Sequence, residues 1–203
     1  MRTIGLLGGM SWLSTLPYYR IINETVSAEL GGLHSAKLLL FSVDFHDIET
    51  LQHAGRWDEA GATLADGAKR LERGGADFLV LCTNTMHRVA EQIEDAVGIP
   101  LLHIADATAA AIASAKIGRV GLLGTRFTME EAFYKERLTE RHGLEVLVPG
   151  PTERSEVNRV IYNELCRGEI DASSRARFAN IAALRMNYTK VSSTVRRKNS
   201  TDL

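Results

Sequence analysis

The sequence predicts an α/β protein made of two pseudo-symmetric lobes, each with a parallel, doubly wound sheet. The second lobe is expected to be incomplete. Short apolar runs alternate with longer amphipathic runs, which is the order of strands and helices in a parallel sheet. The tetrapeptide Gly-Leu-Leu-Gly occurs at 5–8 and again at 121–124, a period too long for a solenoid, so it indicates duplicated halves. We expect a first lobe at 1–104, a second at 105–185 and an irregular tail at 186–203.

The first half contains apolar runs bounded by turn residues, as buried parallel strands do. The expected strands are 3–7, 37–43, 77–82 and 100–104. The expected helices begin at Ser11 or Ser14, at Trp57 and at about Met86. The first of these helices carries one apolar stripe, which we expect to be buried. That stripe consists of Leu16, Tyr19, Ile22 and Val26.

The second half repeats this alternation with fewer strands. The expected strands are 120–123 and 144–148. The expected helices are 106–115 capped by Asp106, 129–141 capped by Thr128, 155–167, and one from Asp171 or Ser173 to about Arg185. From Met186 onward there is neither a helical stripe nor an apolar strand, so we expect a disordered or non-native tail.

Composition excludes several classes of function. The net charge is −1 in 203 residues, so no broad basic surface predicts a nucleic-acid partner. There is no run of eighteen apolar residues, and we expect no membrane partner. The two cysteines, Cys82 and Cys166, give no disulfide framework, which favours the reducing cytoplasm.

Polar side chains and glycines follow the predicted strands where a ligand would bind in a parallel sheet. Residues 83–85, Thr-Asn-Thr, come directly after a buried strand, and their hydroxyls and amide could hold a carboxylate. Ordinary capping of the next helix is an equally good interpretation. The turns at 8–11 and 124–125 let a ligand approach the backbone, although their spacing matches neither a dinucleotide fingerprint nor a phosphate loop.

Cys82 could act as a nucleophile or base with His87 near by, but a free cysteine on a buried strand is more often inert packing. Neighbouring strand residues point to opposite faces, so Cys82 and Thr83 cannot both face one cleft. Cys166, near a helix end, is expected to be a core or surface residue.

Histidines and acidic residues raise the question of a metal site. Four of them crowd a predicted loop without a recognised zinc spacing, so we expect no metal there. They are Asp44, His46, Asp47 and Glu49. His34 and His103 are expected to be structural.

Three motifs together resemble the aspartate/glutamate racemase family over about residues 1–185. They are Ile-Gly-Leu-Leu-Gly-Gly-Met-Ser-Trp at 4–12, Thr-Asn-Thr-Met-His at 83–87, and Gly-Leu-Leu-Gly-Thr-Arg-Phe-Thr-Met at 121–129. The resemblance implies a homodimer whose two lobes enclose an aspartate or glutamate and invert its Cα without any cofactor. One acid/base group stands on each face of Cα, and in the family both are typically cysteines, whose pKa near neutrality suits both roles.

The resemblance also implies the site residues. Thr83 occupies the slot of the first cysteine and is assigned to one face of Cα. The residues assigned to substrate binding are Gly9, Met10, Gln52, Asn84, Thr85, Thr125 and Thr128, with Gln52 facing the substrate side chain. The family's second cysteine lies in a Gly-Cys-Thr-Glu segment, yet the spacing of the repeat places the counterpart of Thr83 at Asn199.

A threonine on one face and no cysteine on the other predict an impaired racemase. The alternative is a non-catalytic binder of small dicarboxylic amino acids, which would keep the carboxylate-holding turns. A third hypothesis is a hydrolase that uses Cys82.

Overall fold

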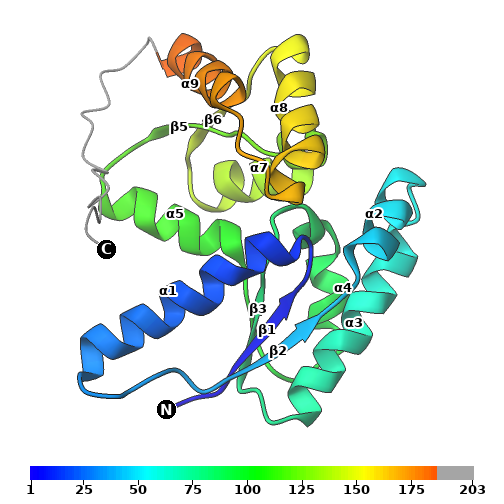
Figure 1. The fold of residues 1–203 in the computed structure, drawn as a ribbon, viewed down its shortest axis with the longest axis vertical. Helices are drawn as coiled ribbons and strands as arrows, with labels where there is room; N and C mark the ends of the chain where they lie inside the picture. Colours follow the sequence, from blue (N-terminus) through cyan, green and yellow to red (C-terminus); the bar gives the residue numbers. More distant parts are fainter. Residues whose placement is uncertain (187–203) are drawn as a thin grey trace.

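The structure is a computed structural model that describes residues 1–186, so the predicted tail and Asn199 lie outside the described residues apart from Met186. The predicted α/β architecture is confirmed (Figure 1). The first lobe holds a four-stranded parallel sheet in the order β2-β1-β3-β4. Its strands are β1 (Ile4–Gly8), β2 (Leu38–Ser42), β3 (Phe78–Leu81) and β4 (Leu101–Leu102).

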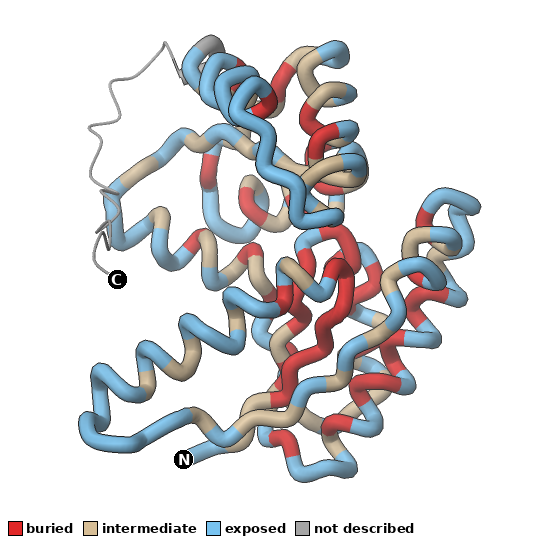
Figure 2. The backbone as a smooth tube through the Cα atoms, viewed as in Figure 1, coloured by how far each residue is buried: buried red, intermediate tan, exposed pale blue. Residues whose placement is uncertain are grey.

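One face of this sheet is closely packed. The long helix α3 (Trp57–Arg73) covers it, with α2 (Phe45–His53) and α4 (Ala90–Glu94) beside it. Leu7, Leu79 and Leu81 alternate on this face and are fully buried against the helix. The main hydrophobic core of the protein therefore lies between the sheet and α3, where Figure 2 shows buried backbone concentrated.

The opposite face of the sheet is incompletely covered. Helix α1 (Trp12–Leu30) runs obliquely away from the strands (Figure 1). Its predicted apolar stripe is only partly covered, because Leu16 and Tyr19 are 54% and 53% exposed, whereas Ile22 and Val26 are half-buried. Leu6 is fully buried, but Leu40 and Leu102, which share its face, are about half exposed. An amphipathic pattern indicates which face of a helix is apolar, but not whether another segment packs against it. Within residues 1–186, the apolar face of α1 is incompletely covered.

The second lobe contains a small parallel sheet of β5 (Arg119–Gly121) and β6 (Glu145–Leu147). Around it lie α5 (Ile104–Ser114), α6 (Arg126–Glu130), α7 (Ala132–Glu136), the π-helical turn η2 (Arg137–Arg141), α8 (Pro151–Asn163), the 3-10 turn η3 (Leu165–Arg167) and α9 (Ala172–Met186). Within the described range this lobe has two strands against four in the first.

Three predicted elements differ in detail. Residues 45–53 form α2 rather than a loop, because the Asp44 carboxylate accepts a hydrogen bond from the His46 N–H at 2.9 Å and caps a helix. The cap of α5 is His103, whose Nδ1 accepts from the Ala105 N–H at 3.2 Å, so Asp106 is not the cap. Asp106 instead binds the guanidinium of Arg137, which holds the pKa of that carboxyl well below its usual range.

The predicted helix 129–141 is also broken. Glu131 has extended backbone angles that separate α6 from α7, and Thr125, rather than Thr128, caps α6. The side chain of Glu131 forms an ion pair with Arg88 of the first lobe, and Trp57 meets Phe127 edge to face at 5.0 Å. The break thus places residues of the second lobe against the first.

Across residues 1–186, no helix is long and apolar enough to cross a membrane, and no group of three or more His, Cys, Asp or Glu side chains could hold a metal ion.

Candidate active site

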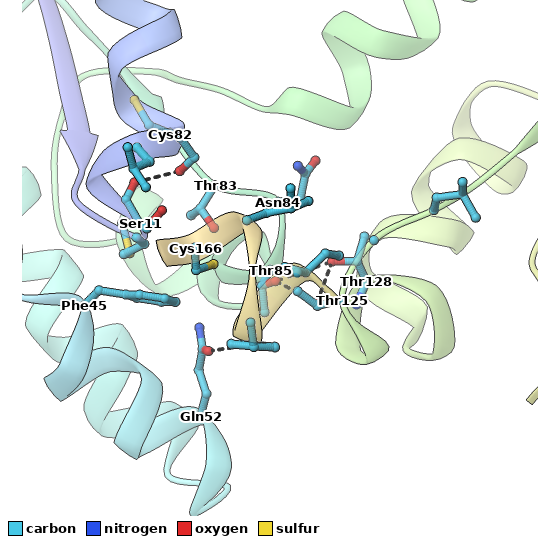
Figure 3. A pocket seen from close by; sticks show the side chains of 18 of the residues that line it. Ser11, Phe45, Gln52, Cys82, Thr83, Asn84, Thr85, Thr125, Thr128 and Cys166 are labelled. Carbon is cyan, nitrogen blue, oxygen red and sulfur yellow. Dashed lines mark hydrogen bonds between the residues drawn. The ribbon is translucent and has the colours of Figure 1, made fainter. Parts of the chain in front are cut away.

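A pocket of about 430 Å³ lies between the two lobes (Figure 3), a size that suits a small molecule. Five segments line it. They are the turn after β1 with the start of α1, helix α2, the segment that follows β3, the turn that leads into α6, and the end of α8 with η3. The pocket therefore lies at the carboxyl ends of two central strands, where the sequence predicts a site.

Thr83 lies just after β3 and is 9% exposed. Its hydroxyl points into the pocket toward Cys166 (Figure 3) and makes no side-chain hydrogen bond with any of the described residues. The thiol of Cys82 points away from both, and burial raises its pKa to about 12. Cys82 therefore borders the pocket without turning its thiol toward Thr83 or Cys166, and a thiol with that pKa is a poor nucleophile.

Three threonine hydroxyls from both lobes meet at one side of the pocket. Thr85 Oγ1 lies 2.8 Å from Thr125 Oγ1 and 3.5 Å from Thr128 Oγ1, and the last two are 3.1 Å apart. Thr85 and Thr128 are buried, while Asn84 beside them is exposed on the pocket wall. The structure therefore brings together four of the residues assigned to substrate binding.

Gln52 also lines the pocket, on the side formed by α2. Its amide nitrogen donates to the sulfur of Met86 at 2.9 Å, and its oxygen accepts from the Tyr162 hydroxyl at 3.2 Å. Burial is the main reason that the pKa of Tyr162 lies above its usual value, so the phenol is neutral near pH 7. Gln52 of the first lobe is thus held in place by a hydrogen bond from Tyr162 of the second lobe.

Met10 and Gly9 differ in their relation to the pocket. Met10 lines it and is buried, whereas Gly9 does not line it. The Gly9 N–H donates to Thr15 Oγ1 at 2.9 Å, and its φ is +97°, which is the left-handed region that favours glycine. Its position gives Gly9 a structural role in shaping the turn that carries Met10.

We expect Gly9→Ala to destabilise the protein by about 3 kcal/mol or more, since positive φ adds strain and a Cβ would lie 2.3 Å from the Val43 carbonyl oxygen. Urea unfolding followed by circular dichroism measures this. Gly55→Ala is the control, because Gly55 has a φ of +71° but an added Cβ would have nothing within 4 Å. The free energy of unfolding of this variant should therefore fall by only about 1 kcal/mol. Equal losses in the two variants would contradict the predicted clash.

Tyr162 and Cys166 are pocket residues that the sequence reasoning missed. Cys166, expected to be a core or surface residue, is half-buried and lines the pocket opposite Thr83 (Figure 3). Burial raises the pKa of its thiol, and a hydrogen bond with Ser11 opposes that effect. No sequence signal joined Tyr162 to Cys166, because α8 ends at Asn163 and Cys166 lies in the separate turn η3.

His87 supports the segment that carries Thr83. Its Nδ1 lies 2.7 Å from the Thr83 carbonyl oxygen, and its Nε2 lies 3.1 Å from the backbone nitrogen of Ile104, where α5 begins. Since the Ile104 N–H can only donate, Nε2 accepts and Nδ1 carries the proton. Burial lowers the pKa of His87 to about 3, so the ring is neutral and links the loop after β3 to the second lobe.

Comparison with known proteins gives consistent results. The Asp/Glu/hydantoin racemase family model matches residues 7–187. The broad specificity amino-acid racemase RacX of Bacillus subtilis is 30% identical over 149 residues, which are 71% of this chain and 63% of that relative.

Two solved structures are similar over 93% of this chain and 81% of their own. One, from Yersinia pestis and provisionally assigned as an Asp/Glu racemase, has a TM-score of 0.84 at 55% identity. The other, an aspartate racemase homologue from Pyrococcus horikoshii, has a TM-score of 0.75 at 32% identity. The match to the family model spans both lobes and the residues that line the pocket between them. The chain belongs to the Asp/Glu/hydantoin racemase family.

Proposed function

We propose that this chain is a cofactor-independent amino-acid racemase that binds its substrate in the pocket between the lobes. Thr83 exchanges a proton on one face of Cα. The observation that carries the proposal is the Thr83 hydroxyl, which is unpaired within the described residues and directed into a pocket that both lobes line, while the residue as a whole is 9% exposed.

The threonine cluster supports the binding part of this proposal. Removal of the Cα proton moves negative charge into the substrate carboxylate, so hydrogen-bond donors at that carboxylate stabilise the transition state. Thr85, Thr125, Thr128 and Asn84 offer such donors near Thr83. Met10 and Gln52 border the remaining substrate.

We further propose that the activity is impaired. A threonine hydroxyl is a much weaker acid than a thiol, and general acid/base catalysis is most efficient when the pKa lies near the working pH. Aspartate and glutamate, the substrates that the resemblance implies, are the first to be assayed. A homodimer and a cytoplasmic location remain predictions.

Loss of the Cα proton signal in D₂O, followed by NMR with L- and D-amino acids, tests the proposal. The Yersinia pestis relative serves as a parallel standard, and we expect slower exchange by this chain. Exchange as fast as by the relative would contradict the impairment. Binding by calorimetry without any Cα exchange would favour the alternative, a non-catalytic binder of small dicarboxylic amino acids.

A further inference from the structure

The charge of the pocket lining is informative about the substrate side chain. Within residues 1–186, no aspartate, glutamate, lysine, arginine or histidine lines the pocket. Its polar groups are hydroxyls, thiols and the amides of Gln52 and Asn84. A substrate carboxylate bound here would have to exchange water for neutral donors alone.

Two charged side chains lie near the pocket without lining it. Glu49 and Arg126 act in opposite directions on the pKa of Tyr162, the first raising it and the second lowering it. Glu49 pairs with His53 at 3.0 Å, and the exposed Arg126 has its guanidinium 5.5 Å from the centre of the Phe127 ring. At the Tyr162 hydroxyl the charges of Glu49 and Arg126 therefore oppose each other.

The α2 side of the pocket offers neutral partners instead. Gln52 is only 3% exposed, and its amide is already bonded to Met86 and Tyr162, which fixes its orientation. Apolar side chains of Phe45, Ile161 and Leu165 line the pocket as well. A neutral polar or apolar side chain can pack here, whereas a carboxylate would lose hydration without gaining a cation from residues 1–186.

We infer that this pocket selects α-amino acids with uncharged side chains over aspartate and glutamate. The inference rests on the proposed function, because it takes this pocket as the substrate site. The α-carboxylate and α-ammonium groups are common to all candidates, so discrimination falls on the side chain. A buried charge without a partner is rejected more strongly than a change of size, since its lost hydration is not replaced.

Nearly isosteric pairs test the inference: glutamate against glutamine, and aspartate against asparagine. Dissociation constants come from calorimetry, and Cα exchange in D₂O is followed for the same four amino acids. We expect each amide to bind at least tenfold more tightly than its acid and to exchange faster. Equal or tighter binding of the acids would overturn the inference.

Variants sharpen the test. Gln52→Arg places a cation in the lining and should shift the preference toward the acids, while Gln52→Met, of similar size and no charge, should not. Arg126→Gln should leave the acid-to-amide ratio unchanged. Selective loss of acid binding in Arg126→Gln would show that this arginine serves the substrate, and would overturn the inference even if the Gln52 variants fail to fold.

The outcomes separate the two proposals. Discrimination in binding with no Cα exchange for any amino acid would refute racemisation and leave the side-chain selectivity standing. Exchange that is faster with glutamate than with glutamine would refute the selectivity and support racemisation. Absence of binding for all four amino acids would overturn both.

Discussion

Thr83→Ala is expected to reduce the Cα exchange rate by about a hundredfold or more, the usual range for a general acid/base group. The hydroxyl of Thr83 points into the pocket and has no other partner within residues 1–186, so its removal takes away proton transfer on one face of Cα. Exchange of the Cα proton in D₂O, measured with saturating substrate, gives this rate directly.

Two further substitutions at the same position make the prediction specific. Thr83→Ser keeps the hydroxyl and should retain most of the exchange. Thr83→Cys introduces a thiol, whose ordinary pKa of about 8.5 is far closer to neutrality than that of an alcohol, so exchange should rise above that of the unmodified chain.

Cys82→Ala is the matched control for the neighbouring residue. The Cys82 thiol is buried, has a pKa of about 12 and points away from Thr83, so exchange should change little provided that the variant remains folded. A large loss in Cys82→Ala together with normal exchange in Thr83→Ala would reverse the assignment. It would instead support chemistry at Cys82.

The central strands and their site residues follow from local sequence patterns. The apolar runs of β1 and β3 are continuous because these two strands lie at the centre of the parallel sheet, and the residues at their ends meet at one edge of the sheet. This is why residues 83–85 could be placed beside a site from the sequence, and why the repeat led to the turn at Thr125 in the second lobe. Thr128 was assigned to the substrate from the family resemblance, and it lines the same pocket.

What could not be predicted depends on tertiary contacts. The stripe on α1 indicates an apolar face, but not whether any described segment covers it, and Leu16 and Tyr19 are exposed. Tyr162 and Cys166 lie far from the glycine turns, and they reach the pocket only because Tyr162 of α8 meets Gln52 of α2 and because η3 packs beside α1. Their polar character alone does not distinguish a site from an ordinary helix surface.

Acidification from pH 7 to pH 5 is expected to destabilise the protein by about 2 kcal/mol through His87 alone. The unfolded chain takes up a proton at the ordinary histidine pKa of about 6.5, whereas burial keeps the folded pKa near 3. Each pH unit below 6.5 therefore favours unfolding by about 1.36 kcal/mol until the folded pKa is reached. His103, whose pKa burial lowers to about 4, contributes in the same direction.

Structure gives the reason that His87 resists protonation. A second proton would have to sit on Nε2, which already accepts from the Ile104 N–H, and the guanidinium of Arg137 and the ring of His103 add repulsion. Protonation would thus break the link between the Thr83 carbonyl and the start of α5.

Urea unfolding at pH 7 and pH 5 measures the difference in the free energy of unfolding. His87→Gln should be less stable at pH 7, because either the Thr83 carbonyl or the Ile104 N–H loses its hydrogen-bond partner. Its loss of stability on acidification should be about 2 kcal/mol smaller than that of the unmodified chain. His34→Gln is the control, since His34 is exposed, and it should keep the full pH dependence. If His87→Gln and the unmodified chain lost equal stability between pH 7 and pH 5, the acid sensitivity would not arise at His87.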